Sequence, residues 1–311
     1  MKAVRLHAKG GAEQLVYEDA PKPTPAAGQA LVRVHAAGIT PTELDWNETY
    51  KHPDGTPRLP SIPGHDVSGT VEALGPGATG LAVGDAVYGL IDFPFDGSCA
   101  EYVVAPAAEL ALKPRTLDHT TAAAVPLSAL TAWEALFTHA KLRSGQRVLL
   151  HGAAGGVGAF AVQLAHAHGA HVVTTSSARH FDFLRDLGAD ELIDYTLERF
   201  EDKVRDADVV LDTLGGDVQA RSWQTLRPGG LLIALNAPVP NPLPRPDVRG
   251  QFFIVRPDRD GLTEIAHRLD AGTLKVFVDG VYPLAEAKQA FDRGRSGHAR
   301  GKLVLTVADL T

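Results

Sequence analysis

Cysteine is almost absent from this chain of 311 residues, in which Cys99 is the only one. A single cysteine cannot form an intrachain disulfide, a paired redox motif or a four-cysteine zinc site. Long apolar runs are also missing, and with them the signal of a membrane-spanning helix. The N-terminal stretch has neither the apolar segment nor the cleavage site typical of a secretory signal peptide. We therefore expect a protein of a reducing compartment, for which the cytoplasm is the simplest assignment.

An excess of positive charge is missing as well. Lys and Arg number 30 against 37 Asp and Glu, which gives a formal net charge of −7 at pH 7. This balance argues against nucleic acid as a partner, and no segment indicates a membrane. Hydrophobic residues make up 44% and charged residues 22% of the chain, as in ordinary globular proteins. The length predicts about two domains.

The pattern of the chain changes near residue 117. Before that point, short apolar runs are separated by turn residues such as Gly and Pro, which predicts a β-rich unit. Its expected strands are 30–34, 67–74, 85–90 and 100–104.

After residue 117, strands alternate with helices, which predicts βαβ units and a parallel, doubly wound sheet. Five prolines from Pro238 to Pro246 then predict a stiff loop. The tail no longer alternates and could return to complete the first domain. The expected strands are 147–151, 171–175, 191–194, 208–212, 230–235, 251–255 and 302–307, and the helices are 120–140, 159–168, 178–187, 219–226, 259–270 and 285–293.

The strongest chemical signal is a glycine-rich loop between the strand 147–151 and the helix that follows it. In this setting glycines allow a sharp turn and the close approach of a pyrophosphate, which the helix N-terminus then binds. The alternative is a flexible turn with tight packing between helix and strand. The loop residues that we expect to bind a dinucleotide are Gly152, Gly155, Gly156, Val157 and Gly158.

The end of the next strand bears on which dinucleotide is bound. Selectivity for NAD usually depends on Asp or Glu at this place, which binds the ribose 2′-hydroxyl. Here Ser176, Ser177 and Arg179 follow, and the next carboxylate is Asp182, inside the expected helix. Hydroxyls and a guanidinium suit a 2′-phosphate, so the sequence favours NADP(H). The serines could instead only cap the helix.

These features, together with the segments Leu187-Gly188-Ala189-Asp190 and Gly301-Lys302-Leu303, resemble the medium-chain dehydrogenase/reductase superfamily over nearly the whole chain. The chain is most similar to the zinc-independent quinone oxidoreductase (zeta-crystallin-like) branch. The resemblance implies an α/β protein with a GroES-like β-rich substrate domain, formed by residues 1–116 and 256–311. A Rossmann NADP(H)-binding domain would span residues 117–255.

The resemblance also implies roles for individual residues. Ser176, Arg179 and Tyr195 would surround the adenosine 2′-phosphate, whereas Leu235 and Asn236 would lie near the nicotinamide together with Thr131. The family further implies a homodimer formed through late strands of the Rossmann sheet.

Zinc enzymes of the superfamily have a Cys after the first-domain glycine and a His-Glu pair. In this chain Thr40 stands at the first place and His65-Asp66 at the second. A catalytic zinc needs three convergent ligands, preferably including thiolates. We therefore expect no metal, and we expect His65 and Asp66 to fix their loop by hydrogen bonds. A site rebuilt from His65, Asp66 and Glu43 is the alternative.

Without a metal, hydride transfer to a quinone or to the β-carbon of an enone is easier than oxidation of an alcohol. The oxygen that becomes negative needs a hydrogen-bond donor. We assign this role to Thr40 and Thr131, although Thr131 could instead hold the nicotinamide amide. Expected walls of the substrate pocket, or else packing residues, are Trp46, Tyr50 and Phe253.

The hypothesis from the sequence is thus an NADPH-dependent quinone or enone oxidoreductase. A different class, an NADPH-binding sensory or structural protein with little turnover, stays open because a fold does not establish catalysis. Among enzymes, an enoyl-thioester reductase and a zinc alcohol dehydrogenase are further alternatives.

Overall fold

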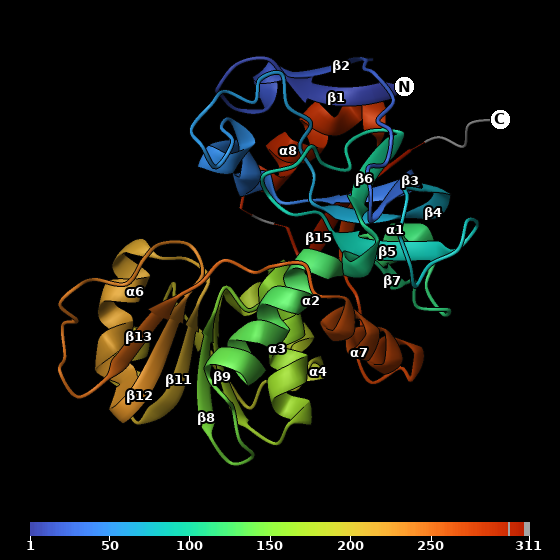
Figure 1. The fold of residues 1–311 in the computed structure, drawn as a ribbon. Helices are drawn as coiled ribbons and strands as arrows, with labels where there is room; N and C mark the ends of the chain where they lie inside the picture. The colour runs from blue at the N-terminus through green and yellow to red at the C-terminus, as the bar shows by residue number, and fades with distance from the viewer. Residues whose placement is uncertain (298, 308–311) are drawn as a thin grey trace. The chain divides into compact units, whose positions relative to one another are not determined.

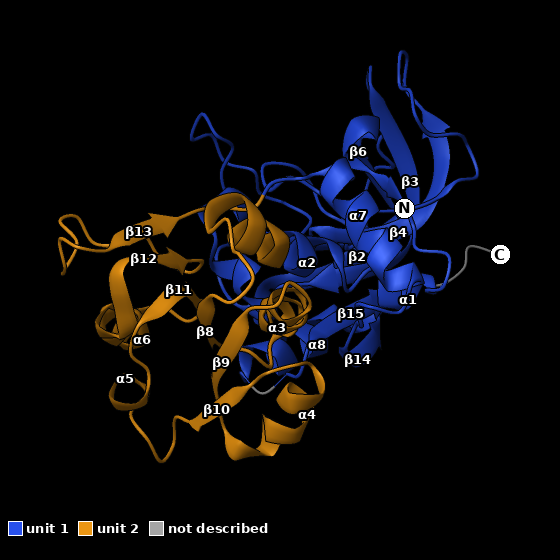
Figure 2. Cartoon of the chain, turned by 90° about the horizontal axis from the view of Figure 1, so that it is seen from below, with its two compact units in different colours: residues 1–130, 256–311 blue, residues 131–255 orange. Residues whose placement is uncertain are grey.

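The structure, a computed structural model, describes residues 1–297 and 299–307. The chain divides into two compact units (Figure 2): unit 1 comprises Met1–Leu130 and Arg256–Thr311, and unit 2 comprises Thr131–Val255. The segment 117–130, which we assigned to the Rossmann domain, belongs to unit 1. The reason is that its helix α1 (His119–Ala122) packs on strands of the unit 1 sheet.

Unit 2 is built on a parallel sheet of six strands in the order β10-β9-β8-β11-β12-β13 (Figure 1; β10 is labelled in Figure 2). The first strand along the chain is central, and the order reverses between β8 and β11. This is the strand order of the Rossmann fold, as predicted, and nucleotides bind at the carboxyl ends of the strands beside such a reversal. The strands are β8 (Arg147–His151), β9 (His171–Ser176), β10 (Glu191–Asp194), β11 (Ala207–Asp212), β12 (Leu226–Ala234) and β13 (Arg249–Phe252).

Helices connect these strands, and most lie where the periodicity predicts them. The exception is the expected helix 120–140, which is broken into three pieces. Pro126 has no N–H group and begins a new helix, because it cannot continue the preceding one. A π-helical segment, Glu134–His139, ends the run. The helix before β8 is α2 (Pro126–Trp133), which begins in unit 1 and ends in unit 2. The helices between the strands are α3 (Gly156–Ala167), α4 (Phe181–Asp186), α5 (Phe200–Lys203) and α6 (Gly216–Ser222).

The core of unit 2 explains why these strands read as nearly continuous apolar runs. A parallel sheet that is covered on both faces buries the residues of both faces. Trp223 and Phe200 are among the largest fully buried side chains and pack against strand residues such as Leu149 and Val210.

Unit 1 contains an antiparallel-rich sheet in the order β14-β15-β3-β4-β5-β7, with β6 also paired to β3, and a separate hairpin of β1 and β2. Strands β1, β2, β7 and β14 were not predicted. The strands are β1 (Lys2–Leu6), β2 (Leu15–Asp19), β3 (Gln29–Ile39), β4 (Asp66–Leu74), β5 (Ala86–Leu90), β6 (Tyr102–Pro106), β7 (Ala111–Leu112), β14 (Val278–Pro283) and β15 (Lys302–Thr306), and the helices besides α1 are α7 (Arg259–Asp270) and α8 (Ala287–Arg295).

The tail of the chain completes this sheet. Strand β15 pairs antiparallel with β3, with Leu303 opposite Ile39, and β3 pairs antiparallel with β4, with Gly38 opposite Asp66. Three strands that are distant in sequence therefore place residues 302, 40 and 66 at one end of the sheet. This register builds the candidate site of unit 1.

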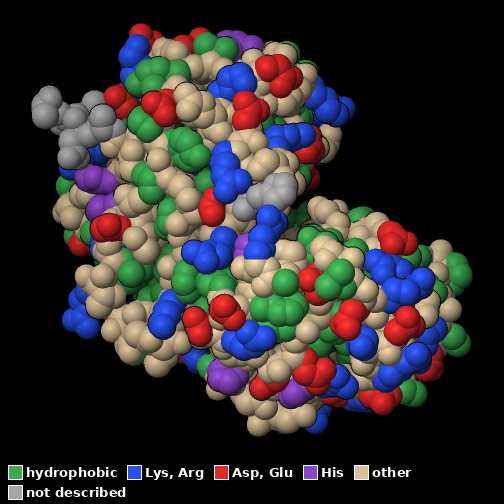
Figure 3. All heavy atoms as spheres, turned by 180° about the vertical axis from the view of Figure 1, so that it is seen from behind, with side chains coloured by type: hydrophobic (Ala, Val, Ile, Leu, Met, Phe, Trp, Pro, Cys, Tyr) green, Lys and Arg blue, Asp and Glu red, His purple; other side chains and the backbone are tan. Residues whose placement is uncertain are grey.

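The surface is mixed in charge. On the face shown in Figure 3, Lys and Arg side chains alternate with Asp and Glu, and no field of one sign covers it. No helix in the described part of the chain has the length and apolar character that crossing a bilayer requires.

Candidate active site

The glycine loop of unit 2 has the geometry of a phosphate cradle. Gly152 has a φ of +68°, which a residue with a side chain rarely adopts. At Gly158, a Cβ atom would lie 2.4 Å from the Gly152 carbonyl oxygen and 2.5 Å from Ala153 Cα. Gly155 caps α3 without a side-chain hydrogen bond. The first N–H groups of α3 are thus left to bind an anion, and the loop fits a dinucleotide pyrophosphate.

The ends of β9 and β10 bring together the residues predicted for the adenosine end. Asp194 pairs with Ser176 across the two strands, so Tyr195 follows directly beside Ser176. The Ser177 hydroxyl is buried and has no hydrogen-bond partner among the described residues. Arg179 is exposed on the short turn Ala178–His180 that follows. A hydroxyl that awaits a partner beside a guanidinium fits a phosphate group.

Carboxylates at this end are already engaged. Asp182 lies in α4 and pairs with Arg185 at 2.8 Å. Asp194 accepts hydrogen bonds from the hydroxyl and N–H groups of Thr196, at 2.6 and 2.9 Å, and these bonds lower the pKa of Asp194.

The ends of β11 and β12 form the other side of the cradle. The Asp212 carboxylate accepts hydrogen bonds from the N–H groups of Leu214 and Gly215, both at 2.9 Å, and so fixes the turn before α6. Leu235 is half-buried and donates its N–H to the Asp212 carbonyl. Asn236 is exposed, and its amide donates to the Leu214 carbonyl at 2.9 Å. All predicted cofactor residues therefore lie at the carboxyl ends of the strands of unit 2.

His151, the last residue of β8 before the glycine loop, is a core residue and does not face the cradle. It is 1% exposed, and its ring is hydrogen-bonded to Thr175 Oγ1 at 2.8 Å and Ser222 Oγ at 2.9 Å. The ring also packs edge-on against Phe200. Burial lowers the pKa of His151 to about 3, so the imidazole is neutral at pH 7.

In unit 1, the predicted donor Thr40 belongs to a buried polar row. The Lys302 ammonium donates to Thr40 Oγ1 at 3.1 Å and forms an ion pair with Asp66 Oδ2 at 2.8 Å. The other oxygen of Asp66 accepts a hydrogen bond from the N–H of Leu127, near the start of α2, at 2.5 Å. Gly38 allows this packing, because a Cβ there would lie 2.3 Å from the Ala123 carbonyl oxygen.

Beneath this row lie Glu43 and His65, both buried. Glu43 accepts hydrogen bonds from the N–H groups of Gly64 at 2.8 Å and Thr40 at 3.3 Å. Burial nevertheless raises the pKa of Glu43 to about 7. His65 Nδ1 lies 3.0 Å from the Ile91 carbonyl, so it carries the hydrogen, and Nε2 lies 3.6 Å from Glu43. Burial lowers the pKa of His65 to about 3. His65 and Asp66 thus fix their loop by hydrogen bonds, as expected.

The aromatic residues predicted for the substrate pocket are placed differently from one another. Trp46 is half-buried, stacks on His65 with ring centroids 5.9 Å apart, and meets the edge of Phe93 at 5.1 Å. Tyr50 is buried, and its hydroxyl donates to the Leu44 carbonyl at 2.5 Å. That bond accounts for Tyr50 as a packing residue, the alternative that the sequence also allowed.

The remaining predicted residues, Thr131 and Phe253, belong to unit 2. Thr131 is buried in α2. Phe253 follows β13 and packs on His139, with ring centroids 4.3 Å apart.

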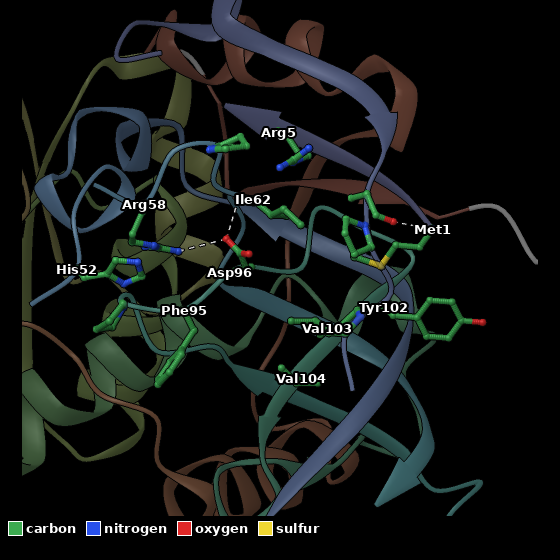
Figure 4. A pocket seen from close by; sticks show the side chains of 16 residues that line it. Met1, Arg5, His52, Arg58, Ile62, Phe95, Asp96, Tyr102, Val103 and Val104 are labelled. Carbon is green, nitrogen blue, oxygen red and sulfur yellow. Dashed lines mark hydrogen bonds and ion pairs between the residues drawn. The ribbon is translucent and has the colours of Figure 1, made fainter. Parts of the chain in front are cut away.

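A separate hollow of about 550 Å³ lies in unit 1 (Figure 4). Its walls include Met1, Ile62, Phe95 and Tyr102, and none of the predicted site residues lines it. Arg58 forms part of the wall and donates to the Phe93 carbonyl at 2.9 Å. This bond holds the loop from which Phe93 reaches His65.

Sequence reasoning missed Lys302 and Phe93 and gave Glu43 only as a possible metal ligand. A lysine at the start of a strand has no local pattern that marks it as buried. The capping-box spacing of Thr40 and Glu43 was a usable signal, since Glu three residues after Thr predicts that its carboxylate turns back to the Thr40 N–H.

Comparison with known proteins agrees with this geometry. Residues 26–115 match the family described as "Alcohol dehydrogenase GroES-like domain", and residues 187–305 match "Zinc-binding dehydrogenase". A "Probable zinc-binding oxidoreductase, mitochondrial" of Arthroderma benhamiae is 35% identical, over 92% of each chain. An "NADPH-dependent alkenal/one oxidoreductase, chloroplastic" of Arabidopsis thaliana is 34% identical, over 89% of this chain and 72% of the relative. Among solved structures, the quinone oxidoreductase from Coxiella burnetii superposes with a TM-score of 0.91 at 32% identity, over 99% of both chains.

Two of these names mention zinc, so the fit of the residues to that ion matters. A catalytic zinc needs at least three protein ligands. Among the residues that the structure describes, no group of three or more His, Cys, Asp and Glu side chains is placed to hold a metal ion. Asp66 is paired with the Lys302 ammonium, and burial raises the pKa of the Cys99 thiol well above its usual value. These residues do not fit a zinc site.

Proposed function

Because the chain belongs to the quinone oxidoreductase branch of the medium-chain dehydrogenase/reductase superfamily, we propose that it transfers hydride from NADPH to a quinone or to an enone, without zinc. That it is an NAD(P)H-dependent oxidoreductase follows from its relatives, among them the alkenal/one oxidoreductase and the quinone oxidoreductase. The observation that supports the narrower proposal is the Thr40–Lys302–Asp66 row. Thr40 and Asp66 stand at sequence positions where the zinc enzymes have a Cys and a Glu, and the Lys302 ammonium, which would repel a cation, contacts both.

When bound, the reduced nicotinamide supplies a hydride to the electron-poor carbon of the acceptor. NADPH, a proton and an enone then give NADP⁺ and the saturated ketone, and with a quinone the product is the hydroquinone. Negative charge develops on the acceptor oxygen, and we propose that the Thr40 hydroxyl donates a hydrogen bond to it. The one proton that this balance requires comes from solvent water. Trp46, stacked on the neutral His65, forms an apolar wall for a flat acceptor.

We propose NADPH rather than NADH as the reductant. The support is the unpartnered Ser177 hydroxyl, the exposed Arg179 and the absence of an unengaged carboxylate at the end of β9 among the described residues. Replacing Arg179 with Ala should weaken NADPH binding at least about tenfold and leave NADH binding unchanged, since one phosphate contact is lost. The matched control is Arg185→Ala, which removes an arginine already paired with Asp182 and should change neither affinity. Tighter binding of NADH than NADPH by the unaltered protein would overturn the cofactor proposal.

The deciding experiment is turnover with a panel of acceptors. Purified protein should oxidise NADPH with 1,4-benzoquinone, 9,10-phenanthrenequinone or a short enone, monitored by loss of absorbance of the reduced cofactor. The same preparation should contain no stoichiometric zinc by elemental analysis, and EDTA should leave the rate unchanged. NADPH binding without turnover on any acceptor would favour the sensory or structural alternative. Turnover that a chelator abolishes and zinc restores would refute the zinc-free mechanism.

A further inference from the structure

The least expected feature of the site is the buried ammonium of Lys302. Its side chain is 7% exposed, and the Asp66 side chain is 1% exposed. A lysine is rarely buried this deeply unless its charge is paired. Asp66 provides that pair, but the same nitrogen also reaches Thr40. The second contact is not needed for charge balance.

The chemistry of the two groups fixes the direction of their hydrogen bond. An ammonium has three donors and no acceptor, whereas a hydroxyl has one donor and two lone pairs. Thr40 Oγ1 therefore accepts from Lys302, and its own hydrogen must point elsewhere. In the described part of the chain, no acceptor is hydrogen-bonded to that hydroxyl. Thr40 is half-buried, so the residue is partly accessible to a bound molecule.

The backbone holds this arrangement in place. Lys302 begins β15 and Thr40 follows β3, and the antiparallel register of the two strands sets them opposite each other. Asp66 begins β4, one pair further across the sheet, opposite Gly38. Asp66 is itself anchored by the Leu127 N–H. Four elements thus converge to place one ammonium group beneath one hydroxyl.

We propose that Lys302 is a positioning residue that orients and polarises the Thr40 hydroxyl as the hydrogen-bond donor to the acceptor oxygen. This inference rests on the proposed function for the identity of the acceptor. Lys302 itself does not touch the substrate. Its role is to occupy a lone pair of Thr40, so that the hydroxyl hydrogen faces the negative charge that develops, and to strengthen that donor by its own charge.

A double-mutant cycle tests whether Lys302 acts through Thr40. Lys302→Met should lower kcat about tenfold or more, short of the ~100- to 1,000-fold loss typical of deleting an oxyanion donor outright. NADPH affinity should stay within about twofold of the unaltered protein, because neither residue belongs to the cofactor-binding set. In the Thr40→Val background, Lys302→Met should cause no further loss of kcat. Lys302→Arg, which keeps a charged donor, should recover part of the rate.

A second variant serves as the control for a loss of stability. Lys302→Met leaves the buried Asp66 carboxylate without its partner, and the protein could fail to fold for that reason alone. The variant Lys302→Met/Asp66→Asn removes both charges and should fold while still showing the loss of kcat. The proposal would be overturned if Lys302→Met lowered kcat in the Thr40→Val background as much as it does in the unaltered protein. A normal kcat in Lys302→Met/Asp66→Asn would overturn it as well.

Failure of the proposed function is read separately. If the unaltered protein turns over none of the acceptors, the proposed function is wrong. The hydrogen bond from Lys302 to Thr40 is then tested by NMR spectroscopy, which does not require turnover. In ¹H–¹⁵N spectra of the lysine ammonium groups, the Lys302 signal is identified by its disappearance in Lys302→Met. It should shift in Thr40→Val and stay near its place in Thr40→Ser. An unchanged signal in Thr40→Val would show that Lys302 does not donate to Thr40.

Discussion

His151 offers a quantitative test of how the core of unit 2 is built. Its ring lies between Thr175 and Ser222, and Ser222 Oγ also donates to the Val218 carbonyl at 2.6 Å. Ser222 therefore accepts from His151 Nε2, and Nδ1 accepts from the Thr175 hydroxyl. Adding a second proton would place a charge in the core, which is why the pKa of His151 falls to about 3.

The pH dependence follows from linkage. A histidine in the unfolded chain titrates at a pKa of about 6.5, so below that pH the unfolded state binds a proton that the folded state refuses. Stability from neutral His151 is thus fully present above about pH 6.5 and is lost as the pH falls toward 3. Between about pH 7.5 and pH 5 the loss is about 2 kcal/mol for this residue. The buried His65 adds to the loss in the same direction.

The assay is urea unfolding at both pH values. Glutamine can keep both hydrogen bonds but does not titrate, so His151→Gln should lose about 2 kcal/mol less on acidification than the unaltered protein. At about pH 7.5 it should be less stable by about 1–3 kcal/mol, because the fit of the hydrogen bonds is imperfect. The matched control is His267→Gln at a side chain that is 73% exposed, and it should keep the original loss. Equal loss in His151→Gln and the control would refute the reasoning.

Three further outcomes are expected. Gly158→Ala should weaken NADPH binding at least about tenfold and lower Tm, because its Cβ would lie 2.4 Å from the Gly152 carbonyl oxygen. Gly155→Ala should lower Tm less, because the nearest contact of its Cβ would be at 3.3 Å. Calorimetry measures both the binding and Tm. Trp46→Ala should raise KM for 9,10-phenanthrenequinone several-fold and leave KM for NADPH unchanged, with Trp46→Phe close to the original in steady-state kinetics, since an apolar wall is what the site loses. We also propose a homodimer formed at β13, which pairs only with β12 among the described strands, so light scattering should give twice 33.0 kDa rather than one chain mass.

Local sequence patterns predicted much of the fold. Strands β8 and β10 and helix α7 have the bounds that periodicity and turn residues predict, because each is defined by neighbours along the chain. The glycine loop was equally readable, since its function depends on backbone freedom that only glycine provides. The prediction of one continuous helix over 120–140 was wrong. The helical spacing of apolar residues continues past Pro126, but proline has no N–H group to continue the hydrogen bonds of the preceding helix.

The other features depend on pairing between strands that are distant in the sequence, which local patterns do not predict. No residue of strand β14 is fully buried, so its apolar signal is weak. Lys302 is a charged residue at the start of an apolar strand, and such a residue is usually exposed. Only the register of β15 on β3 shows that it is buried beside Asp66. His151 stands next to the glycine loop in the sequence, and only its hydrogen bonds to Thr175 and Ser222 show that it belongs to the core.

The order in which the strands of unit 1 are synthesised has a consequence for how the protein matures. Strands β3 and β4 leave the ribosome long before β15, yet Asp66 has its ammonium partner only after residue 302 has been made. Until then the carboxylate must stay hydrated, and the sheet cannot close around it. A nascent chain can complete the parallel sheet of unit 2 first, because β8 to β13 are contiguous, whereas the sheet of unit 1 must wait for residue 302. Ribosome-bound or truncated chains should therefore bind the dinucleotide without being able to reduce anything.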